Sequence, residues 1–397
     1  MNKFVYLDNN ATTPTDQRVV EAMLPYFNKF YGNPSSVYTL ASKSKDAMEQ
    51  ARLEVGMILN AKPEEIFFTS GGTEADNLAI KGVAFANKEK GNHIITSKIE
   101  HHAVLNTCKW LEKQGFNVTY IGVDKYGIVN LEELREAIDD TTVLVTIMHA
   151  NNEIGTIEPI EEINRIIQEI NNKRKANQKP QIYFHTDAVQ SVGKIPIDVN
   201  RLGVDLLSLS GHKFYGPKGV GALFIRKGTK IDPLLHGGHH ERNRRAGTEN
   251  VPGIVGLGKA CETALEEVEK EQTRLRTLRD KLERGILEKI DDVIVNGHPE
   301  KRLAGTLSVC VKYIEGESML LNLDFEGIAA SSGSACTSGS LEPSHVLLAC
   351  GLSPEIAHGS LRFSLGHGTS EDDINYVIEI LPPIVKKLRE MSPFKKE

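Results

Sequence analysis

Short apolar runs, bounded by glycine, proline or polar residues, alternate along the chain with longer stretches whose apolar residues recur every three or four positions. The short runs are typical of buried strands, and the longer stretches are typical of amphipathic helices. The expected strands are 66–69, 94–97, 118–123, 143–148, 182–185, 206–209 and 221–225. The expected helices are 37–59, 73–87, 103–115, 131–138 and 160–175. This alternation predicts an α/β fold with a mostly parallel seven-stranded sheet that is covered on both faces.

Two polar stretches are expected to mark the ends of helices. Asn33-Pro-Ser-Ser36 precedes the 37–59 helix and is a suitable N-cap for it. The segment 171–181 is polar and strongly basic. We therefore expect a solvated helix end there, followed by a surface loop.

A long helical pattern follows the expected sheet, from about residue 253 to residue 290. Its apolar stripe consists of Leu265, Val268, Leu275, Leu278, Leu282 and Ile286. A coiled coil would show such a stripe, but a helix packed along a domain is the commoner source. We expect this helix to join the sheet to a smaller α+β unit. The expected elements of that unit are strands at 306–311 and 361–365 and a helix at 371–391.

A length of 397 residues exceeds what one hydrophobic core usually supports, so we expect two domains. Residues 1–15 are expected to form an N-terminal arm that contributes to the small domain and the active site. Residues 16–255 are expected to form the large cofactor-binding domain. Residues 256–397 are expected to form the small α+β domain, which carries Cys336 on a mobile loop.

Charge and composition exclude several kinds of partner. The net charge of -6 gives no reason to expect nucleic acid or an anionic membrane surface. The apolar run at the N-terminus is too short for a signal peptide, and no apolar stretch approaches the ~20 residues of a membrane helix. A cytoplasmic location is therefore expected.

The cysteines are scattered and form no CxxC pair, so neither a disulfide framework nor a metal site is expected. They are Cys108, Cys261, Cys310, Cys336 and Cys350. Four have mainly apolar or helical neighbours and are expected to be packing residues. Cys336 lies instead in the small-residue run Ser331-Ser-Gly-Ser-Ala-Cys-Thr-Ser-Gly-Ser340. It is a candidate thiolate nucleophile, although an exposed cysteine without function would fit the local sequence equally well.

A turn between two expected strands contains Lys213. The turn, Ser208-Leu-Ser-Gly-His-Lys-Phe-Tyr-Gly-Pro-Lys-Gly219, is bounded on both sides by apolar runs. A lysine at the end of buried strands can be desolvated, which lowers its pKa and leaves an amine able to form a Schiff base. A solvated loop lysine is the commoner case, so this interpretation depends on the rest of the chain.

Two further features complete what pyridoxal phosphate requires of a protein. The Gly72-Thr73 turn opens an expected helix, whose free N–H groups suit a phosphate. Asp187 follows the strand 182–185, where open α/β sheets bind ligands, and a carboxylate buried there needs a cation such as the protonated ring nitrogen. A plain helix cap and an ordinary ion pair are the alternatives for each feature alone. Together with Lys213, the two features predict this cofactor.

A candidate for binding a substrate carboxylate lies near the end of the chain. In Ser360-Leu-Arg-Phe-Ser-Leu365 the apolar residues alternate with polar ones, so Arg362 lies on the polar face of the strand. An arginine on such a face is usually solvated. Its guanidinium is also the best available fork for a carboxylate.

Over nearly its whole length the chain resembles the NifS/IscS-type cysteine desulfurases, which are fold-type I enzymes dependent on pyridoxal phosphate. The first matching stretches are Tyr6-Leu-Asp-Asn-Asn-Ala-Thr-Thr13, Gly32-Asn-Pro-Ser-Ser36, Gly72-Thr-Glu74, Glu100-His101 and Asn151-Asn-Glu-Ile-Gly155. The others are His185-Thr-Asp-Ala-Val-Gln190, Ser210-Gly-His-Lys213, Gly247-Thr248, 331–345 and Leu361-Arg-Phe-Ser-Leu365. The cysteine-loop motif at 331–345 is specific to the long-loop class of the family.

The resemblance implies how the cofactor would be held. Lys213 would form the internal aldimine, Asp187 would contact the pyridinium nitrogen, and Gln190 would bond the ring hydroxyl. His101 would stack on the ring and assist proton transfer. The residues that would hold the phosphate are Gly72, Thr73, Ser210, His212 and, from the second subunit of a homodimer, Thr248.

The resemblance also implies the substrate and the reaction. Asn152 would contact both cofactor and substrate, and Arg362 would bind the carboxylate of L-cysteine. The Cys336 thiolate would attack the substrate sulfur, which leaves L-alanine and a persulfide on Cys336. That sulfur would pass to an acceptor protein for iron–sulfur cluster assembly or a related transfer.

Departures from the family leave the acceptor open. The segment 171–179 resembles an insertion, and Gly366-His-Gly368 stands where the family often has an arginine. The chain ends at Glu397 without the longer tail with which housekeeping members dock a scaffold. The acceptor could be a general iron–sulfur scaffold, a nitrogenase-type scaffold or a tRNA-thiolation protein. A selenocysteine lyase, a class V aminotransferase and a non-catalytic scaffold that keeps the fold are the alternative functions.

Overall fold

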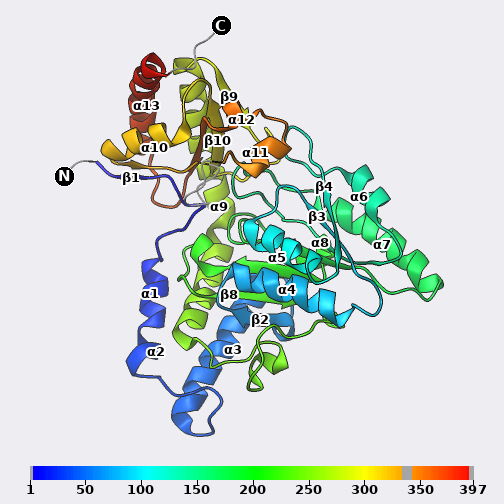
Figure 1. Cartoon of the computed structure of the whole chain (residues 1–397). Helices are drawn as coiled ribbons and strands as arrows, with labels where there is room; N and C mark the ends of the chain where they lie inside the picture. The colour runs from blue at the N-terminus through cyan, green and yellow to red at the C-terminus, as the bar shows by residue number, and fades with distance from the viewer. Residues whose placement is uncertain (1–2, 333–341, 393–397) are drawn as a thin grey trace.

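A seven-stranded sheet forms the centre of the larger part of the molecule (Figure 1). The computed structural model describes residues 3–332 and 342–392. The strands, in spatial order, are β2 (Ile66–Thr69), β8 (Gly221–Ile225), β7 (Leu206–Ser210), β6 (Tyr183–Asp187), β5 (Thr142–Thr146), β3 (His93–Ser97) and β4 (Asn117–Ile121). Only β8 runs antiparallel to its neighbours in this sheet, and the other pairs are parallel. The expected mostly parallel sheet is confirmed.

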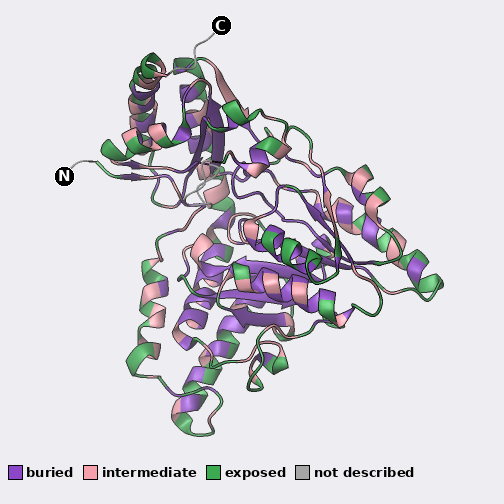
Figure 2. Cartoon of the chain, viewed as in Figure 1, coloured by how far each residue is buried: buried purple, intermediate pink, exposed green. Residues whose placement is uncertain are grey.

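Helices cover both faces of the sheet. They are α3 (Thr39–Leu59), α4 (Gly72–Ala86), α5 (His102–Glu112), α6 (Leu131–Ala137) and α7 (Ile160–Ala176). Successive strand residues point to opposite faces, so each strand contributes to two cores. Tyr183 and Leu206 belong to the core shared with α4 and α5. Phe184 and Leu207 belong to the core shared with α3, α6 and α7. Buried residues accordingly run through all the central strands (Figure 2).

One long helix, α9 (Val251–Lys289), extends from the sheet into a second core (Figure 1). Its residue Leu257 belongs to the first core, whereas Leu278 and Leu282 belong to the second. Leu265, which lies between these two parts of the helix, is 43% exposed. Apart from Leu265, the apolar stripe is therefore a packing surface within this chain, as expected.

The second core belongs to a smaller α+β unit. Its antiparallel sheet has the order β12 (Ser360–Ser364), β10 (Thr306–Val311) and β9 (Val293–Asn296). The helices α10 (Gly316–Phe325) and α13 (Glu371–Met391) pack against it. The remaining short helices are α1 (Gln17–Met23), α2 (Pro25–Asn28), α8 (Val199–Leu202), α11 (His345–Ala349) and α12 (Pro354–Ala357), with single 3-10 turns at Pro63–Glu65, Gly211–Lys213 and His240–Asn243.

The N-terminal arm connects the two parts of the molecule. Strand β1 (Val5–Tyr6) pairs in parallel with β11 (Ile328–Ala329), and Asp8 then forms a bridge with Ser364. Beyond this point the Thr13 N–H donates to the His212 carbonyl at 2.9 Å. The arm thus crosses from the small sheet to the turn that contains Lys213.

Two local predictions need correction. Helix α3 begins at Thr39 rather than at residue 37, because the Asn33 carboxamide accepts the Ser35 N–H and closes a turn instead of capping the helix. The basic segment is mostly exposed, but Arg174 is buried and donates to the Thr142 carbonyl at 2.8 Å. Within residues 3–332 and 342–392, none of the helices is long and apolar enough to cross a membrane.

Candidate active site

The turn after β7 places Lys213 beside the N-terminal arm. Its Nζ donates to the carbonyl oxygens of Asn10 at 2.7 Å and Ala11 at 2.8 Å. The turn itself is fixed by Thr13, whose Oγ1 donates to the His212 carbonyl at 3.0 Å and accepts the Tyr215 N–H at 2.7 Å. The arm and the turn therefore hold the lysine amine in one place.

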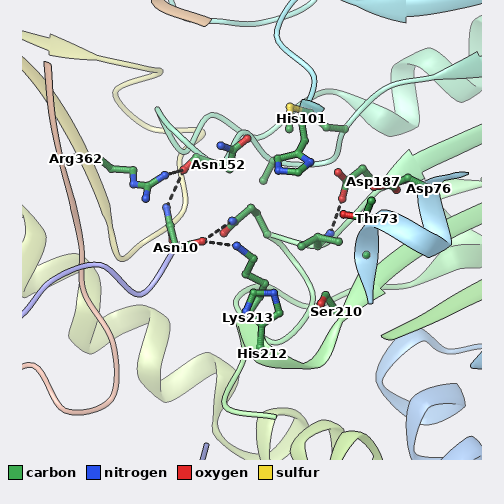
Figure 3. Close-up of a pocket in the computed structure, with 15 residues that line it drawn as sticks. Asn10, Thr73, Asp76, His101, Asn152, Asp187, Ser210, His212, Lys213 and Arg362 are labelled. Atoms are coloured by element: carbon green, nitrogen blue, oxygen red, sulfur yellow. Dashed lines mark hydrogen bonds between the residues drawn. The ribbon is translucent and has the colours of Figure 1, made fainter. Parts of the chain in front are cut away.

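A cavity of about 240 Å³ opens in front of this amine (Figure 3). The residues that line it are Asn10, Gly72, Thr73, Asp76, His101, Met148, Ala150, Asn152, Asp187, Val189, Gln190, Ser210, His212, Lys213 and Arg362. All the site residues expected from the sequence are among them except Thr248 and Cys336. Thr248 is exposed and does not line the cavity, and Cys336 lies outside the described residues.

Two acidic side chains lie together at one end of the cavity (Figure 3). Asp187 is the last residue of β6, is 5% exposed, and accepts the Val189 N–H at 2.9 Å. Asp76 on α4 is 1% exposed, and its Oδ1 has no hydrogen-bond partner. Burial raises the pKa of Asp187 to about 6, and burial together with the charge of Asp187 raises the pKa of Asp76. This end of the cavity suits a ligand that brings a positively charged N–H group.

The start of α4 forms an adjacent cradle of backbone N–H groups. Gly71 has a φ of 152°, and Gly72 is the first residue of the helix. A Cβ atom at Gly72 would lie only 2.6 Å from Cγ2 of Val189, so a larger residue would not fit there. Thr73 and Ser210 line the same part of the cavity. The helix end and the hydroxyl groups together suit a phosphate.

His101 contributes an imidazole side chain to the cavity. It is the N-cap of α5, and its Nδ1 accepts the Ala103 N–H at 3.1 Å. Burial and the charge of Lys213 lower the pKa of His101 to about 4. The ring is therefore neutral at pH 7. Since Nδ1 accepts a hydrogen bond, the ring proton lies on Nε2, which remains able to donate.

Arg362 lies at the opposite side of the cavity and is only 2% exposed. Its Nη1 donates to the Asn152 carbonyl at 2.9 Å, and its Nη2 pairs with Asp8 Oδ1 at 2.8 Å. The alternating pattern of β12 had made a solvated arginine the ordinary expectation. The arm covers the polar face of this strand, which is why Arg362 is buried. A buried guanidinium that keeps its Nε unpartnered suits a ligand carboxylate.

Sequence reasoning missed five residues of the cavity, of which two, Asn10 and Asp76, are polar. Asn10 lies in the motif 6–13, and Asp76 follows the Gly72-Thr73 turn by one helical turn. The spacing of Asp76 offered a signal, because residues four apart lie on one face of a helix. Asn10 offered none, because its place depends on the long-range packing of the arm.

Glu100, adjacent in sequence to His101, is a buried acid beside the cavity. Its Oε1 accepts from Ser97 Oγ at 2.6 Å and from the Met148 N–H at 3.0 Å, while its Oε2 has no hydrogen-bond partner. Burial raises the pKa of Glu100 to about 8. The folded protein therefore keeps a proton there at neutral pH that the unfolded chain releases.

This proton predicts a pH-dependent effect of Glu100→Gln on stability. Between pH 5.5 and 8 the folded wild type binds a proton that the unfolded chain loses, so this group makes the free energy of unfolding fall as pH rises. Glutamine mimics the protonated acid and does not titrate. Urea unfolding is measured at both pH values. From pH 5.5 to pH 8, the free energy of unfolding of the variant should rise by about 3 kcal/mol relative to that of wild type. Equal slopes of stability against pH for both proteins would contradict the assignment.

The chain is similar to known proteins over nearly its whole length. The model of the aminotransferase class-V family matches residues 5–377. The chain belongs to this family. A cysteine desulfurase IscS from Methanosarcina thermophila is 62% identical over 392 residues, which cover 99% of this chain and 94% of that protein.

Solved structures give the same assignment. A NifS-like protein aligns with a TM-score of 0.87 at 42% identity, over 98% of this chain and 99% of its own. SspA, solved in complex with cysteine, aligns with a TM-score of 0.78 at 40% identity, over 91% of this chain and 98% of its own. The predicted family, fold class and enzyme class are confirmed by these class-V relatives. Pyridoxal phosphate is a general property of the class-V aminotransferase family.

Proposed function

We propose that this class-V protein is a cysteine desulfurase that converts L-cysteine to L-alanine and stores the sulfur as a persulfide on Cys336. The observation that carries the proposal is the order of groups around one cavity. Two buried acids and a helix N-terminus lie at one end, an amine lies in the middle, and a buried guanidinium lies at the far side. A cofactor and an amino acid substrate need these groups in this order.

The residues present fit pyridoxal phosphate. The buried acid pair, in which Asp76 Oδ1 has no hydrogen-bond partner, fits the protonated ring nitrogen, and the close approach at Gly72 fits the phosphate. Thr73, Ser210 and His212 would complete the phosphate site, and Gln190 would bond the ring hydroxyl. When bound, the cofactor supplies an electron-withdrawing ring that weakens the bonds around the α-carbon of an attached amino acid.

The chain's own groups then divide the remaining work. Lys213 would hold the cofactor through its amine, which the Asn10 and Ala11 carbonyls keep at the cavity. Arg362 and Asn152 hold the substrate carboxylate, which fixes the direction of the side chain. Neutral His101 can take and return a proton within the cavity, since its lowered pKa keeps it uncharged.

Cys336 performs the sulfur transfer in this proposal. Its thiolate attacks the substrate Sγ, so a sulfur–sulfur bond forms while the carbon–sulfur bond breaks. The carbon takes up a proton and leaves as L-alanine, and the persulfide remains on Cys336. No external oxidant is needed, because the substrate carbon is reduced as the sulfur is oxidised.

The assembly and the acceptor are further parts of the proposal. Thr248 is exposed and lies outside the cavity of its own chain, which supports a homodimer in which Thr248 contacts the phosphate of the partner's site. The persulfide sulfur would pass to an acceptor protein, such as an iron–sulfur scaffold, in the cytoplasm. A dimer explains why the motif 247–248 belongs with the cofactor motifs although it does not line this cavity.

The test is to identify the products made from L-cysteine. With a thiol reductant present, the purified yellow protein should release L-alanine and sulfide in equal amounts, without any keto acid. Pyruvate and ammonia in place of alanine would indicate simple elimination. A requirement for a keto acid would indicate an aminotransferase, and a colourless protein that cannot take up the cofactor would indicate a non-catalytic scaffold. Competition with L-selenocysteine separates the desulfurase from a selenocysteine lyase.

A further inference from the structure

A second lysine, Lys194, lies behind the cavity in the segment that follows β6. Its Nζ donates to Oδ1 of Asn10 at 2.9 Å and to Oε1 of Gln190 at 2.7 Å. Both acceptors are neutral amides that line the cavity. Among residues 3–332 and 342–392, no carboxylate forms an ion pair with Lys194. This amine therefore does not serve as one half of a stabilising charge pair.

Asn10 joins Lys194 to the amine of Lys213. The Asn10 carbonyl accepts from Lys213 Nζ at 2.7 Å and from Gln190 Nε2 at 2.9 Å (Figure 3). The Asn10 side chain also donates to Thr306 Oγ1 at 3.0 Å. The position of Asn10 thus depends on contacts to both parts of the molecule, and Lys194 supplies the contact from the larger part to the Asn10 side chain.

The bond to Gln190 has a directional effect. An amide can turn by 180° and exchange its oxygen and nitrogen. In the observed arrangement Lys194 Nζ donates to Oε1 of Gln190, which holds this oxygen on the lysine's side. The Nε2 group must then point toward the Asn10 carbonyl and the cavity.

The charges around this network make the arrangement costly. The charged and titratable groups that face Lys213 are Asp187 on β6, Arg362 on β12, His101 at the start of α5, His212 on its own turn, and Lys194. Burial, followed by the charges of Lys213 and Arg362, lowers the pKa of Lys194. A buried amine without a counter-charge destabilises a fold, so its presence calls for a role in the site.

We propose that Lys194 is a positioning residue for Lys213 and Gln190: it fixes the arm carbonyl on which the Lys213 amine rests and the direction of the Gln190 amide. The proposal rests on the proposed function, in which Lys213 joins the cofactor. Each time the lysine is released, the Asn10 and Ala11 carbonyls hold its amine at the cavity, ready to return. Without Lys194, the arm carbonyl and the amide each gain freedom, so the amine is less often correctly placed.

The test measures how fast the cofactor-free protein captures pyridoxal phosphate. Capture is monitored by the rise of the visible absorbance of the protein. Lys194→Met should slow capture about tenfold, which corresponds to the loss of roughly one charge-assisted hydrogen bond. Lys194→Arg keeps donor groups and should restore most of the rate. The exposed Lys218, five residues after Lys213, provides the control, and Lys218→Met should capture the cofactor at the wild-type rate. The thermal midpoint of each cofactor-free variant is measured in parallel.

The outcomes separate this inference from the proposed function. Capture at the wild-type rate by Lys194→Met overturns the inference and leaves the proposed function intact. Slow capture together with a large loss of thermal midpoint, neither of which recovers in Lys194→Arg, shows a merely structural role. This outcome also overturns the inference. If wild type develops no visible band, the proposed function fails and this inference fails with it. If Lys194→Met does not fold, Lys194→Gln, which is too short to reach both amides, is expected to show the same slow capture.

Discussion

Replacing Cys336 with serine should abolish persulfide formation and lower alanine release from L-cysteine by about 10³-fold or more. A serine hydroxyl is hardly ionised at neutral pH and cannot displace carbon from sulfur. The cofactor should still bind, because none of the residues that line the cavity is changed. Alanine and sulfide are measured with a thiol reductant, and the persulfide is sought by mass spectrometry of the protein after one turnover.

The other cysteines provide the control for this experiment. Burial raises the pKa of each of the four cysteines in the described part of the chain, to about 12 for Cys350 and about 11 for Cys310. These thiols stay protonated at neutral pH and are poor nucleophiles. Cys350→Ala should therefore keep wild-type activity. Retained sulfide release in the Cys336→Ser protein would contradict the nucleophile assignment and indicate direct release of sulfide at the cofactor.

Replacing Lys213 with alanine should cause a loss of alanine release on the order of 10³- to 10⁶-fold, since an essential group that works as part of a unit is removed. The visible band of the purified protein should shift or disappear, because the chain no longer offers an amine to the cofactor. The measurement combines the absorbance spectrum with the product assay. The substitution also removes the two hydrogen bonds that Lys213 Nζ donates to the Asn10 and Ala11 carbonyls.

Lys218→Ala is the matched control for this substitution, because the residue is exposed and lies on the same turn. Its spectrum and its rate should equal those of wild type. Wild-type activity in the Lys213→Ala protein would show that another amine joins the cofactor. Lys194 would then be the first residue to examine, since its amine lies within the same hydrogen-bond network.

Much of the site could be predicted because its signals are local. Lys213, Asp187 and the Gly72-Thr73 turn each lie at the end of an apolar strand, and parallel strands bring such ends to one edge of the sheet. The burial of Arg362 could not be predicted in this way. It depends on the arm crossing the polar face of β12, a contact that joins residues 354 positions apart.

The same distinction applies to the fold. The strands of the large sheet and the long helices were predicted within a few residues, because their apolar patterns extend over several positions, whereas β9 was missed. Short elements such as β1 and β11 were missed, since two residues carry no period and pair only after the small unit has formed. Lys194 also gave no signal, because the Asn10 side chain that it contacts is brought there from 184 positions away.

The path of the N-terminal arm constrains when the protein can become active during its synthesis. The arm is synthesised well before its pairing partners at Ile328–Ala329 and Ser364, which lie more than 300 residues further along the chain. Contacts over such separations form late, since a long loop must be closed before they are made. A nascent chain that already contains Lys213 and Asp187 still lacks the ordered carbonyls of the arm and the guanidinium of Arg362. The cavity is therefore completed only after residues 328–364 have been synthesised and have paired with the arm.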